Sequence, residues 1–547
     1  MASQPPATRS TANPWWVLFF LSLGFFMILL DTTIVNIAIP SIIPALKSSF
    51  DQILWVLNAY LLVYAVLLIT FGRLGDIVGQ RRLFIVGLVI FTAASALCGL
   101  AQDGDQLIAA RILQGVGGAI LTPQTLSIIT MIFPPERRGA AFGLWGAVAG
   151  VASVTGPTLG GFLVSYVDWR WIFYVNVPVG IIALLGAFFI VPDLRPGRRH
   201  RLDMVGVVLA SAGLFGIVFG LVEGQRYDWG AFWGQVTIPE IIAAGVIVFL
   251  GFVIFERFQP EPLLPLSLFG NLNFSVAIWI SAAVSFGLLG FFIPITIFLQ
   301  SVLGFSALKA GLTFIPMSLM SAITAPIAGR LSDRFGGKYI LMAGLTLFAV
   351  GLGLVVYLIS LSATQATFWG PAAVAGIGMG MTFAPLTTVA MRDIRPQMAG
   401  AASGVLNTVR QLGGAVGSAV IGAVLQNRLA SELHDQAVAY SGQVNPAFRN
   451  RFIDGFSHVA SSGFKVGVGQ TGGVQLPANV PPSIAQSLQS LFRTVFDNAY
   501  VNAVRPTLAV SIVVLGVGAL SCLLIEDRRK AAARADVIHE RAQAAGQ

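Results

Sequence analysis

Charged residues are the scarcest feature of this sequence. Asp, Glu, Lys and Arg make up 10% of the 547 residues, whereas 56% are hydrophobic. Soluble domains carry roughly 25% charged residues, so this composition argues against a soluble globular protein. Apolar stretches of about 20 residues recur with almost no charge, as helices that cross a bilayer require. The apolar–polar alternation of membrane β-barrels is missing, and we expect an all-α polytopic membrane protein.

Cysteine and histidine are also scarce. Cys98 and Cys522 lie in apolar stretches, where we expect them to pack as small core residues rather than to form a disulfide or metal pair. The four histidines lie in polar stretches without the spacing of a metal or haem site. No Gly-x-x-x-x-Gly-Lys-Ser/Thr loop is present, which argues against nucleotide binding. We therefore expect no metal, no cofactor and no catalytic residue, so the chain is not expected to be an enzyme.

The positive charge is explained by membrane orientation. A net charge of +9 would suggest nucleic-acid binding in a soluble protein, but here Lys and Arg gather in alternate short loops between apolar stretches. Basic loops stay in the cytoplasm, so we expect both termini on the cytoplasmic side of the inner membrane, and no nucleic-acid partner. The first apolar stretch is too long for the hydrophobic region of a cleaved signal peptide.

Hydropathy predicts fourteen spanning helices, with boundaries at residues 15–39, 53–71, 83–100, 107–133, 140–166, 171–191, 204–221, 236–255, 274–299, 310–331, 339–361, 367–391, 400–425 and 506–525. The predicted parts are a cytoplasmic segment 1–14, a six-helix bundle 15–191, a linker with two extra helices 192–272, a second six-helix bundle 273–526 and a cytoplasmic tail 527–547. The extra pair is expected between the two bundles.

One predicted loop is long. Residues 426–505 are expected on the extracytoplasmic side, and the segment after Pro482 carries apolar residues at helical spacing. The simpler interpretation is a solvated or membrane-skimming helix. The alternative is a substrate gate or a docking element for a periplasmic or cell-envelope partner.

The chain repeats itself at two loops. Residues 72–82 read GRLGDIVGQRR after the second predicted helix, and residues 329–338 read GRLSDRFGGK after the tenth. Glycine allows a tight turn between two helices that approach closely. Asp76 and Asp333 can lie near a helix N-terminus and pair with loop arginines, which would make a breakable latch. The alternative is a solvated basic loop that only fixes topology.

Asp31 and Arg111 are two charged residues that lie deep within predicted membrane helices. Asp31, in the stretch LDTTIVNIAIP (residues 30–40), lies about 16 residues from the inner end of its helix, or roughly 24 Å deep. Arg111, in RILQGVGGA (residues 111–119), lies about five residues from the outer end of its helix, so the two residues are at similar depth. An acid in a bilayer span indicates function by default. The alternatives are a static ion pair, or an anchor for Asn36.

The fifth predicted helix is rich in glycine and ends in Gly-Pro-x-x-Gly-Gly. Glycines at four-residue spacing allow close helix contact, and proline bends a helix. Ordinary small-residue packing would explain the glycines, although less well this ending. The sixth helix opens with WRWIFYVNVP (residues 169–178), whose aromatic residues suit the membrane interface.

Together these segments resemble the major facilitator superfamily, and within it the fourteen-span drug:proton antiporters of the EmrB/QacA type. The likeness covers nearly the whole chain and is weakest in the loop 426–505. It implies two six-helix bundles plus two extra helices, with the first and fourth helices lining a central cavity. It also implies export of lipophilic or amphipathic small molecules in exchange for protons by alternating access, with antibiotic resistance as a consequence.

The resemblance also implies roles for particular residues. Proton coupling falls to Asp31 and Arg111. The gating motif comprises Gly72, Asp76, Arg81, Arg82, Gly329, Asp333 and Arg334. The antiporter motif comprises Gly150, Gly156, Pro157, Gly160 and Gly161, and it disfavours a nutrient symporter.

The predicted cavity departs from family members that expel dicationic antiseptics. Those carry further acids in the tenth and thirteenth helices, which are absent here, and we expect Glu223 and Glu256 to be solvated at helix ends. Neutral, amphipathic or anionic cargo therefore fits better. Candidate cavity residues are Asn36, Gln114, Phe292, Met317, Asn407 and Arg410, although the apolar ones could be ordinary core. Alternatives are a dedicated exporter of one lipid or secondary metabolite, and an accessory protein that docks partners through its long loop.

Overall fold

The structure is a computed structural model that describes residues 13–193, 202–224, 226–444, 446, 449–450, 452–454, 456 and 482–526. The first half contains α1 (Pro14–Ala45), α2 (Phe50–Val78), α3 (Gln80–Leu100), α4 (Gly104–Ile132), η1 (Pro135–Arg137), α5 (Arg138–Tyr166), α6 (Trp171–Tyr174) and α7 (Asn176–Phe189). An inserted part follows, with α8 (Met204–Glu223), β1 (Ala231–Trp233), β2 (Val236–Thr237), α9 (Ile238–Glu256) and η2 (Leu266–Gly270).

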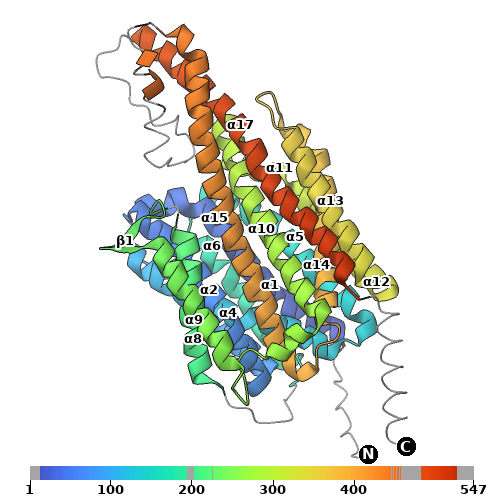
Figure 1. Ribbon diagram of the computed structural model, residues 1–547. Helices are drawn as coiled ribbons and strands as arrows, with labels where there is room; N and C mark the ends of the chain where they lie inside the picture. The colour runs from blue at the N-terminus through green and yellow to red at the C-terminus, as the bar shows by residue number, and fades with distance from the viewer. Residues whose placement is uncertain are drawn as a thin grey trace, which may run out of the picture.

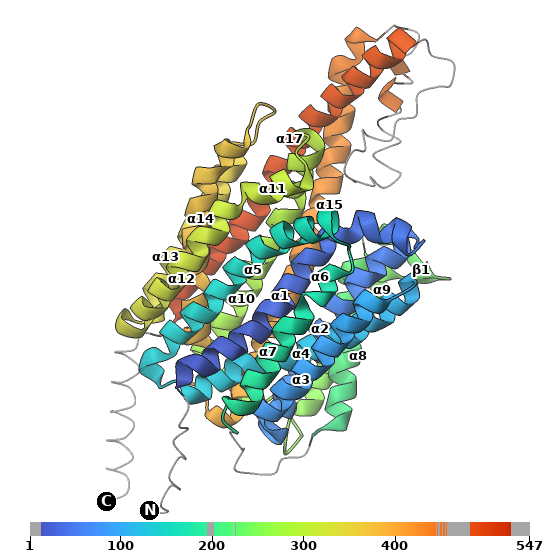
Figure 2. The ribbon, with the colours of Figure 1, turned by 180° about the vertical axis from the view of Figure 1, so that it is seen from behind.

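The second half repeats the helical pattern of the first. It contains α10 (Leu272–Ile297), η3 (Phe298–Val302), α11 (Ala307–Thr313), α12 (Ile315–Phe335), α13 (Gly337–Tyr357), α14 (Gln365–Met391), η4 (Pro396–Met398), α15 (Ala399–Tyr440), η5 (Ser441–Gln443), α17 (Pro482–Ser521) and η7 (Cys522–Leu524). Figure 2 shows the two halves side by side, α1 to α7 in blue and teal and α10 to α14 in green and yellow.

Local sequence signals explain where several helices begin and turn. The Ser49 hydroxyl caps α2 by accepting a hydrogen bond from the Gln52 backbone amide at 3.1 Å. In turn, the side-chain oxygen of Gln52 accepts a hydrogen bond from the Ser49 backbone amide. Gly79 (φ 108°) and Gly336 (φ 87°) separate α2 from α3 and α12 from α13. A positive φ favours glycine, so the two matching glycines of the repeated loops make the same turn.

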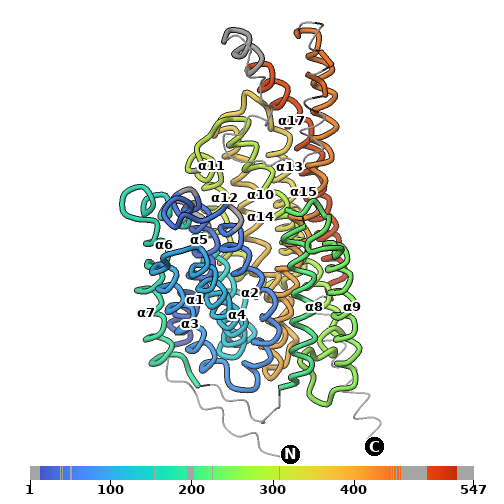
Figure 3. The backbone as a smooth tube through the Cα atoms, turned by 90° about the vertical axis from the view of Figure 1, so that its left-hand side faces the viewer, coloured from blue at the N-terminus to red at the C-terminus, as the bar shows by residue number. Residues whose placement is uncertain are grey.

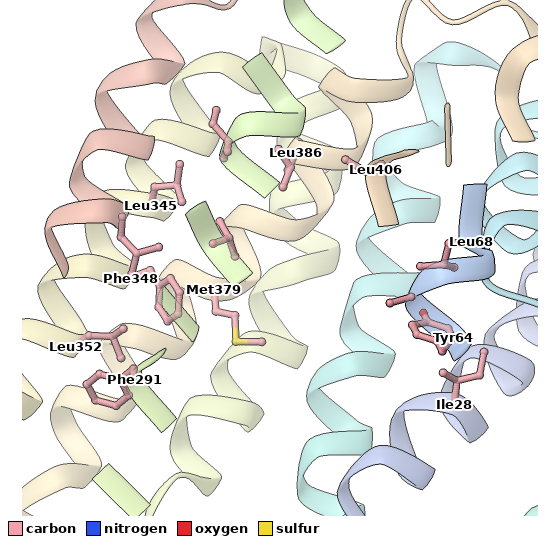
Figure 4. Close-up of a cluster of buried hydrophobic side chains, with 14 of the residues drawn as sticks. Ile28, Tyr64, Leu68, Phe291, Leu345, Phe348, Leu352, Met379, Leu386 and Leu406 are labelled. Atoms are coloured by element: carbon pink, nitrogen blue, oxygen red, sulfur yellow. The ribbon is translucent and has the colours of Figure 1, made fainter. Parts of the chain in front are cut away.

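Twelve helices among the described residues are long and apolar enough to cross a membrane. These helices form a multi-pass set, and α5 and α12 are not among the twelve. Both are nonetheless long, with 29 and 21 residues, and they pack on each other across the two halves. A buried apolar core runs through both halves, and Figure 4 shows part of it, from Phe291 and Phe348 on one side to Tyr64 and Ile28 on the other.

The inserted helices do not lie between the halves as we predicted. α8 packs on α2 of the first half and on α15 of the second, and α9 packs on α8. Figure 3 shows the pair at one side of the bundle, next to α15. Since α9 is apolar and largely exposed, it presents a surface that suits lipid rather than a protein core.

Both ends of the predicted loop 426–505 are helical, which corrects its bounds, and the helix predicted after Pro482 is confirmed. α15 continues to Tyr440, and α17 begins at Pro482 and runs through Pro506 without interruption. These extensions pack on each other and project beyond the other helices in Figure 1, in orange and red. Their contact surfaces are buried and apolar, with Leu425, Leu429, Leu433, Ala437, Val495, Phe496, Ala499 and Tyr500. Residues 457–481 lie outside the described residues.

Candidate functional site

Asp31 of α1 and Arg111 of α4 form a buried ion pair. Arg111 Nη1 lies 2.5 Å from Asp31 Oδ2, and the two side chains are 1% and 0% exposed. The Arg111 Nε donates to the Val56 carbonyl at 3.1 Å, and the guanidinium lies 4.2 Å from the centroid of the Tyr60 ring. The depth argument from the sequence therefore matched two residues that the structure brings into direct contact.

A glutamine that we assigned to the cavity completes this pair. Gln114 accepts from Arg111 Nη1 at 2.8 Å and donates to Asp31 Oδ1 at 2.8 Å, so it links both charges. Its Nε2 also lies 3.3 Å from Ser95 Oγ, which accepts a bond from Asn176 as well. Gln114 follows Arg111 by three residues on one face of α4, a spacing that could have indicated this role.

The chemistry of the pair follows from its burial. Two charges out of water are stable only while both are paired and hydrogen-bonded, because removing one partner leaves an uncompensated charge. A proton on Asp31 would cancel one charge and weaken its hold on Arg111. Both side chains lie within the helix bundle rather than at its surface.

A second feature is a contact between halves that we call the α2–α15 latch. Asp76 at the end of α2 accepts from the Gly400 and Ala401 amides in the first turn of α15, both at 2.9 Å. Gln80 adds a bond to Asp76 Oδ1 at 3.1 Å. The first amides of a helix lack partners within the helix and carry partial positive charge, so they bind a carboxylate well.

The repeat produces the same contact in reverse, which we call the α12–α5 latch. Asp333 at the end of α12 accepts from the Gly139 amide at 2.7 Å and the Ala140 amide at 2.9 Å, in the first turn of α5. Each half therefore supplies one carboxylate and one helix N-terminus. The start of α1 and the end of α17 lie at this same end of the molecule in Figures 1 and 2.

Close backbone approach accompanies each latch. A Cβ at Gly72 would lie 2.5 Å from the Gly400 carbonyl oxygen, so the helices could not approach this closely with any larger residue. Gly329 meets Gly139 in the same way at the α12–α5 latch. The sequence carried a signal that we missed, because residues 135–143 and 396–404 both read Pro-x-x-x-Gly-Ala-Ala-x-Gly.

We predicted that the gating arginines pair with the latch carboxylates. In the described residues, Arg81, Arg82 and Arg334 form no hydrogen bond with Asp76 or Asp333. Arg81 donates from Nε to the Ala187 carbonyl at 3.3 Å and from Nη2 to the Phe188 carbonyl, so it ties α3 to the end of α7. Arg82 and Arg334 are exposed. A helix terminus took the place of the arginines, because its backbone amides are fixed in position and a long side chain is not.

The glycines of the fifth helix face two different neighbours. A Cβ at Gly150 would lie 2.9 Å from the Ser318 carbonyl of α12, and one at Gly156 would overlap Thr33 of α1. A Cβ at Gly161 would meet nothing within 4 Å. Gly160 is buried, and the Pro157 side chain lies outside the described residues, although α5 is helical throughout.

A cavity of only about 10 Å³ lies where the halves meet. Two predicted cavity residues, Asn407 and Arg410, line it together with Trp145 from the first half. The remaining lining residues are Leu126, Ser281, Val284, Phe383, Leu386, Thr387 and Leu406.

The other predicted cavity residues lie elsewhere. Asn36 is exposed and donates to the Thr32 carbonyl at 2.9 Å. Phe292 packs 5.3 Å from the ring of Phe314, and Met317 is buried in the core of the second half. Asp31 and Arg111 do not line the small cavity between the halves either. Both are buried within the first half, where α1 and α4 pack near α2 and α6.

Glu223 and Glu256 are buried, which corrects our prediction that both are solvated. Glu223 is 1% exposed, accepts from Asn58 at 2.8 Å and pairs with Arg226 at 3.0 Å. Glu256 is 2% exposed and accepts from the Leu264 amide at 3.2 Å. Position at a helix end did not predict exposure, because α2 and the segment after α9 cover these ends.

The fold and the site together define a membrane transport protein made of two similar helical halves, latched to each other at one end around a central cavity. Residues 21–418 match the family model of the Major Facilitator Superfamily. The chain belongs to this superfamily.

Named relatives agree with this family. The chain is 42% identical over 434 residues to an uncharacterised MFS-type transporter of Mycobacterium tuberculosis, covering 79% of this chain and 73% of that protein. It is 34% identical over 433 residues to the tetracenomycin C resistance and export protein of Streptomyces glaucescens, covering 79% of each. The fold resembles the human organic anion transporter MFSD10, with a TM-score of 0.56 at 15% identity, covering 77% of this chain and 94% of that one.

Proposed function

We propose that this chain exports drugs or related lipophilic small molecules across the cytoplasmic membrane in exchange for protons. The observation that carries the proposal is the buried Asp31–Arg111 pair, a titratable carboxylate held inside a transporter fold. Similarity to a resistance and export protein supports outward transport of a small molecule.

The proposed topology has fourteen spans. α5 and α12 join the twelve apolar helices, because each lies at the interface between the halves, where polar and small residues replace lipid-facing ones. The charge alternation of the loops then places the latch end and both termini in the cytoplasm. An impermeant thiol reagent that labels a Ser490→Cys variant only from the cytoplasmic side contradicts this topology.

The proposed cycle couples the pair to the latches. With both latches formed, the cytoplasmic side is closed and the halves can separate only at the opposite end. Proton binding to Asp31 from that side releases Arg111 and Gln114, which changes how α1 and α4 pack. Breaking the latches then opens the cytoplasmic side, the proton leaves, and cargo enters the central cavity. The halves rock about this cavity, as in other transporters built from parallel repeats.

The lining of the central cavity favours neutral or anionic cargo. Arg410 is its one ionisable lining residue among the described residues, and the rest of the lining is apolar apart from amide, hydroxyl and indole groups. A dication would meet a positive charge without a carboxylate to balance it. A second candidate is export of one secondary metabolite, favoured because a relative that covers 79% of this chain is named for a single compound.

Transport by purified protein in proteoliposomes tests the proposal. With an imposed pH gradient, neutral and monoanionic lipophilic compounds should dissipate the gradient faster than dicationic antiseptics. The Asp31→Asn variant keeps the size and hydrogen bonding of the side chain, and it should lose gradient-driven transport. A panel in which dications rank first would contradict the cargo, and full gradient-driven transport by Asp31→Asn would contradict the coupling. A panel with one active compound would favour the dedicated exporter.

A further inference from the structure

A second pair of carboxylates lies near the α2–α15 latch. Asp203 caps α8 through Oδ1, which accepts from the Gly206 amide at 2.9 Å, and Glu256 ends α9. Asp203 Oδ2 and Glu256 Oε1 are both buried and have no hydrogen-bond partner. A Cβ at Gly206 would lie 2.6 Å from Glu256 Oε1 and 2.8 Å from Asp203 Oδ2, so both free oxygens border the same small space. We call Asp203 and Glu256 the acidic pair.

A buried cation lies beside the acidic pair. Arg73 of α2 is 7% exposed, and its Nε has no hydrogen-bond partner. Its charge acts on both Glu256 and Asp76, so it lies between the acidic pair and the latch carboxylate. A buried guanidinium nitrogen without a hydrogen-bond partner costs free energy. It indicates that Arg73 gains a hydrogen-bond partner when the nearby carboxylates change their charge or when the helices change their arrangement.

The repeat supplies an internal comparison. Arg330 occupies the position of Arg73 in the second repeated loop, and it is exposed. The difference arises from α8, which packs on α2 and α15 but has no counterpart over α12 and α5. Arg73 is therefore buried beside the inserted helices, whose ends also carry the two carboxylates of the acidic pair.

The charges around the acidic pair set its proton occupancy. Arg73 comes from α2, and Asp76 reaches the pair only through Arg73. Residues 399–409 of α15 contain no titratable side chain. Arg257, next to Glu256, is exposed, and Glu261 is half-buried with its own interaction. Among the described residues named here, Arg73 is the one buried cation beside three carboxylates, so we expect the two adjacent carboxylates with free oxygens to share a proton.

We propose that Asp203 and Glu256 form a second proton-binding site, distinct from Asp31, that sets the strength of the α2–α15 latch through Arg73. When the acidic pair holds a proton, it attracts Arg73 less, and Arg73 stabilises the negative charge of Asp76, to which the α15 amides donate. When the acidic pair has lost this proton, it attracts Arg73 away from Asp76 and the α2–α15 latch weakens. The cytoplasmic side therefore opens more readily as the pH of the cytoplasm rises. This inference rests on the proposed role of the latch as the cytoplasmic gate.

A distance measurement across the latch tests the inference. Spin labels on Val78→Cys at the end of α2 and on Gln397→Cys in η4, just before α15, report the opening in the full-length protein. Both positions are exposed, and the two native cysteines are buried. As the pH rises from about 5 to about 8, the population with the longer distance should increase at least threefold. A shift of roughly this size is expected when the closed and open states differ in their affinity for one proton. Glu256→Gln should stay closed across this range, and Arg73→Gln should lose the pH response.

Two controls separate this inference from the proposed transport cycle. Arg330→Gln removes the matching arginine of the other repeat and should keep the wild-type pH response. Asp31→Asn removes the proposed transport proton and should change the fraction of open molecules at every pH, but the dependence of that fraction on pH through Glu256 should remain. If Asp31→Asn abolishes the response while Glu256→Gln retains it, the second site is refuted and the proton of the transport cycle stands. A wild-type response in both Glu256→Gln and Asp203→Asn, or a response to Na⁺ at constant pH in place of one to protons, also overturns the inference.

Discussion

The two latches have the same design and different surroundings. Each consists of a carboxylate that accepts two amides from the first turn of a helix in the other half, with a glycine contact beside it. Asp76 is 3% exposed and lies under α8, whereas Asp333 borders an open cavity lined by Trp15, Arg330 and Arg334. Water and salt weaken the charge interactions of the exposed latch more than those of the buried one.

The comparison shows what the inserted helices add. A twelve-helix arrangement of two repeated halves would give two latches of similar strength. The placement of α8 over α2 and α15 buries one of them and leaves the other in contact with solvent. We therefore expect the α2–α15 latch to dominate the closed state of the cytoplasmic side.

The largest effect is expected for Asp76→Asn. This change replaces one of the two buried carboxylate oxygens that accept amide hydrogen bonds, and such a bond contributes about 1.5–3 kcal/mol when one partner is charged. The closed state should lose roughly 10- to 100-fold in population relative to the open state. The label pair at positions 78 and 397 measures this shift directly, and surface expression should fall less than transport. An unchanged distance distribution with normal transport would remove the latch from the account.

Gly72→Ala should have the next largest effect. Its Cβ would lie 2.5 Å from the Gly400 carbonyl oxygen, so the closed state must separate the helices at a cost of about 1–3 kcal/mol. Gly329→Ala should behave alike, because its Cβ would lie even closer to the Gly139 carbonyl oxygen. Gly251→Ala in α9 is the control, since its Cβ meets nothing within 4 Å, and its transport rate should match the wild type. Equal rates for all three variants would show that close helix approach is not needed.

A smaller effect is expected for Asp333→Asn. A half-exposed carboxylate at a helix N-terminus contributes about 0.5–1 kcal/mol, which corresponds to a roughly two- to fivefold shift. Labels placed across α12 and α5 measure it. A shift as large as that of Asp76→Asn would mean that burial under α8 does not distinguish the latches.

The smallest effect is expected from salt. Raising the ionic strength to about 1 M shortens the screening length to about 3 Å, which weakens exposed charge interactions. Opening at the α12–α5 latch should increase by less than about twofold, and the distance across the α2–α15 latch should not change. A larger salt response at the buried latch would reverse the comparison.

The sequence allowed much of this arrangement to be predicted. Hydropathy and the positions of glycine and proline located nearly every long helix, and the repeated loops pointed to both latch carboxylates. The depth of Asp31 and Arg111 within their helices predicted that they lie at one level, because rise per residue is fixed in a helix. These features depend on local periodicity, which a single sequence contains.

Other features depend on long-range packing, which the sequence does not display. Hydropathy treated residues after 425 as a loop because Arg428, Glu432 and Asp435 are polar, although the four-residue spacing of Leu425, Leu429 and Leu433 marks one face of a helix. The burial of Glu256 depends on a segment that returns over α9. The arrangement of Gln114 between two charges depends on three helices that meet only in the folded chain.

Proton release from purified protein tests the central claim, that Asp31 carries the transported proton, most directly. Addition of a transported compound to wild-type protein in a weakly buffered detergent solution should release protons, with an amount that varies with pH. Asp31→Asn should bind the compound and release none through this site. Release by Asp31→Asn with an unchanged pH profile would contradict the account and place the carrier elsewhere, with Glu223 as the next buried carboxylate to replace.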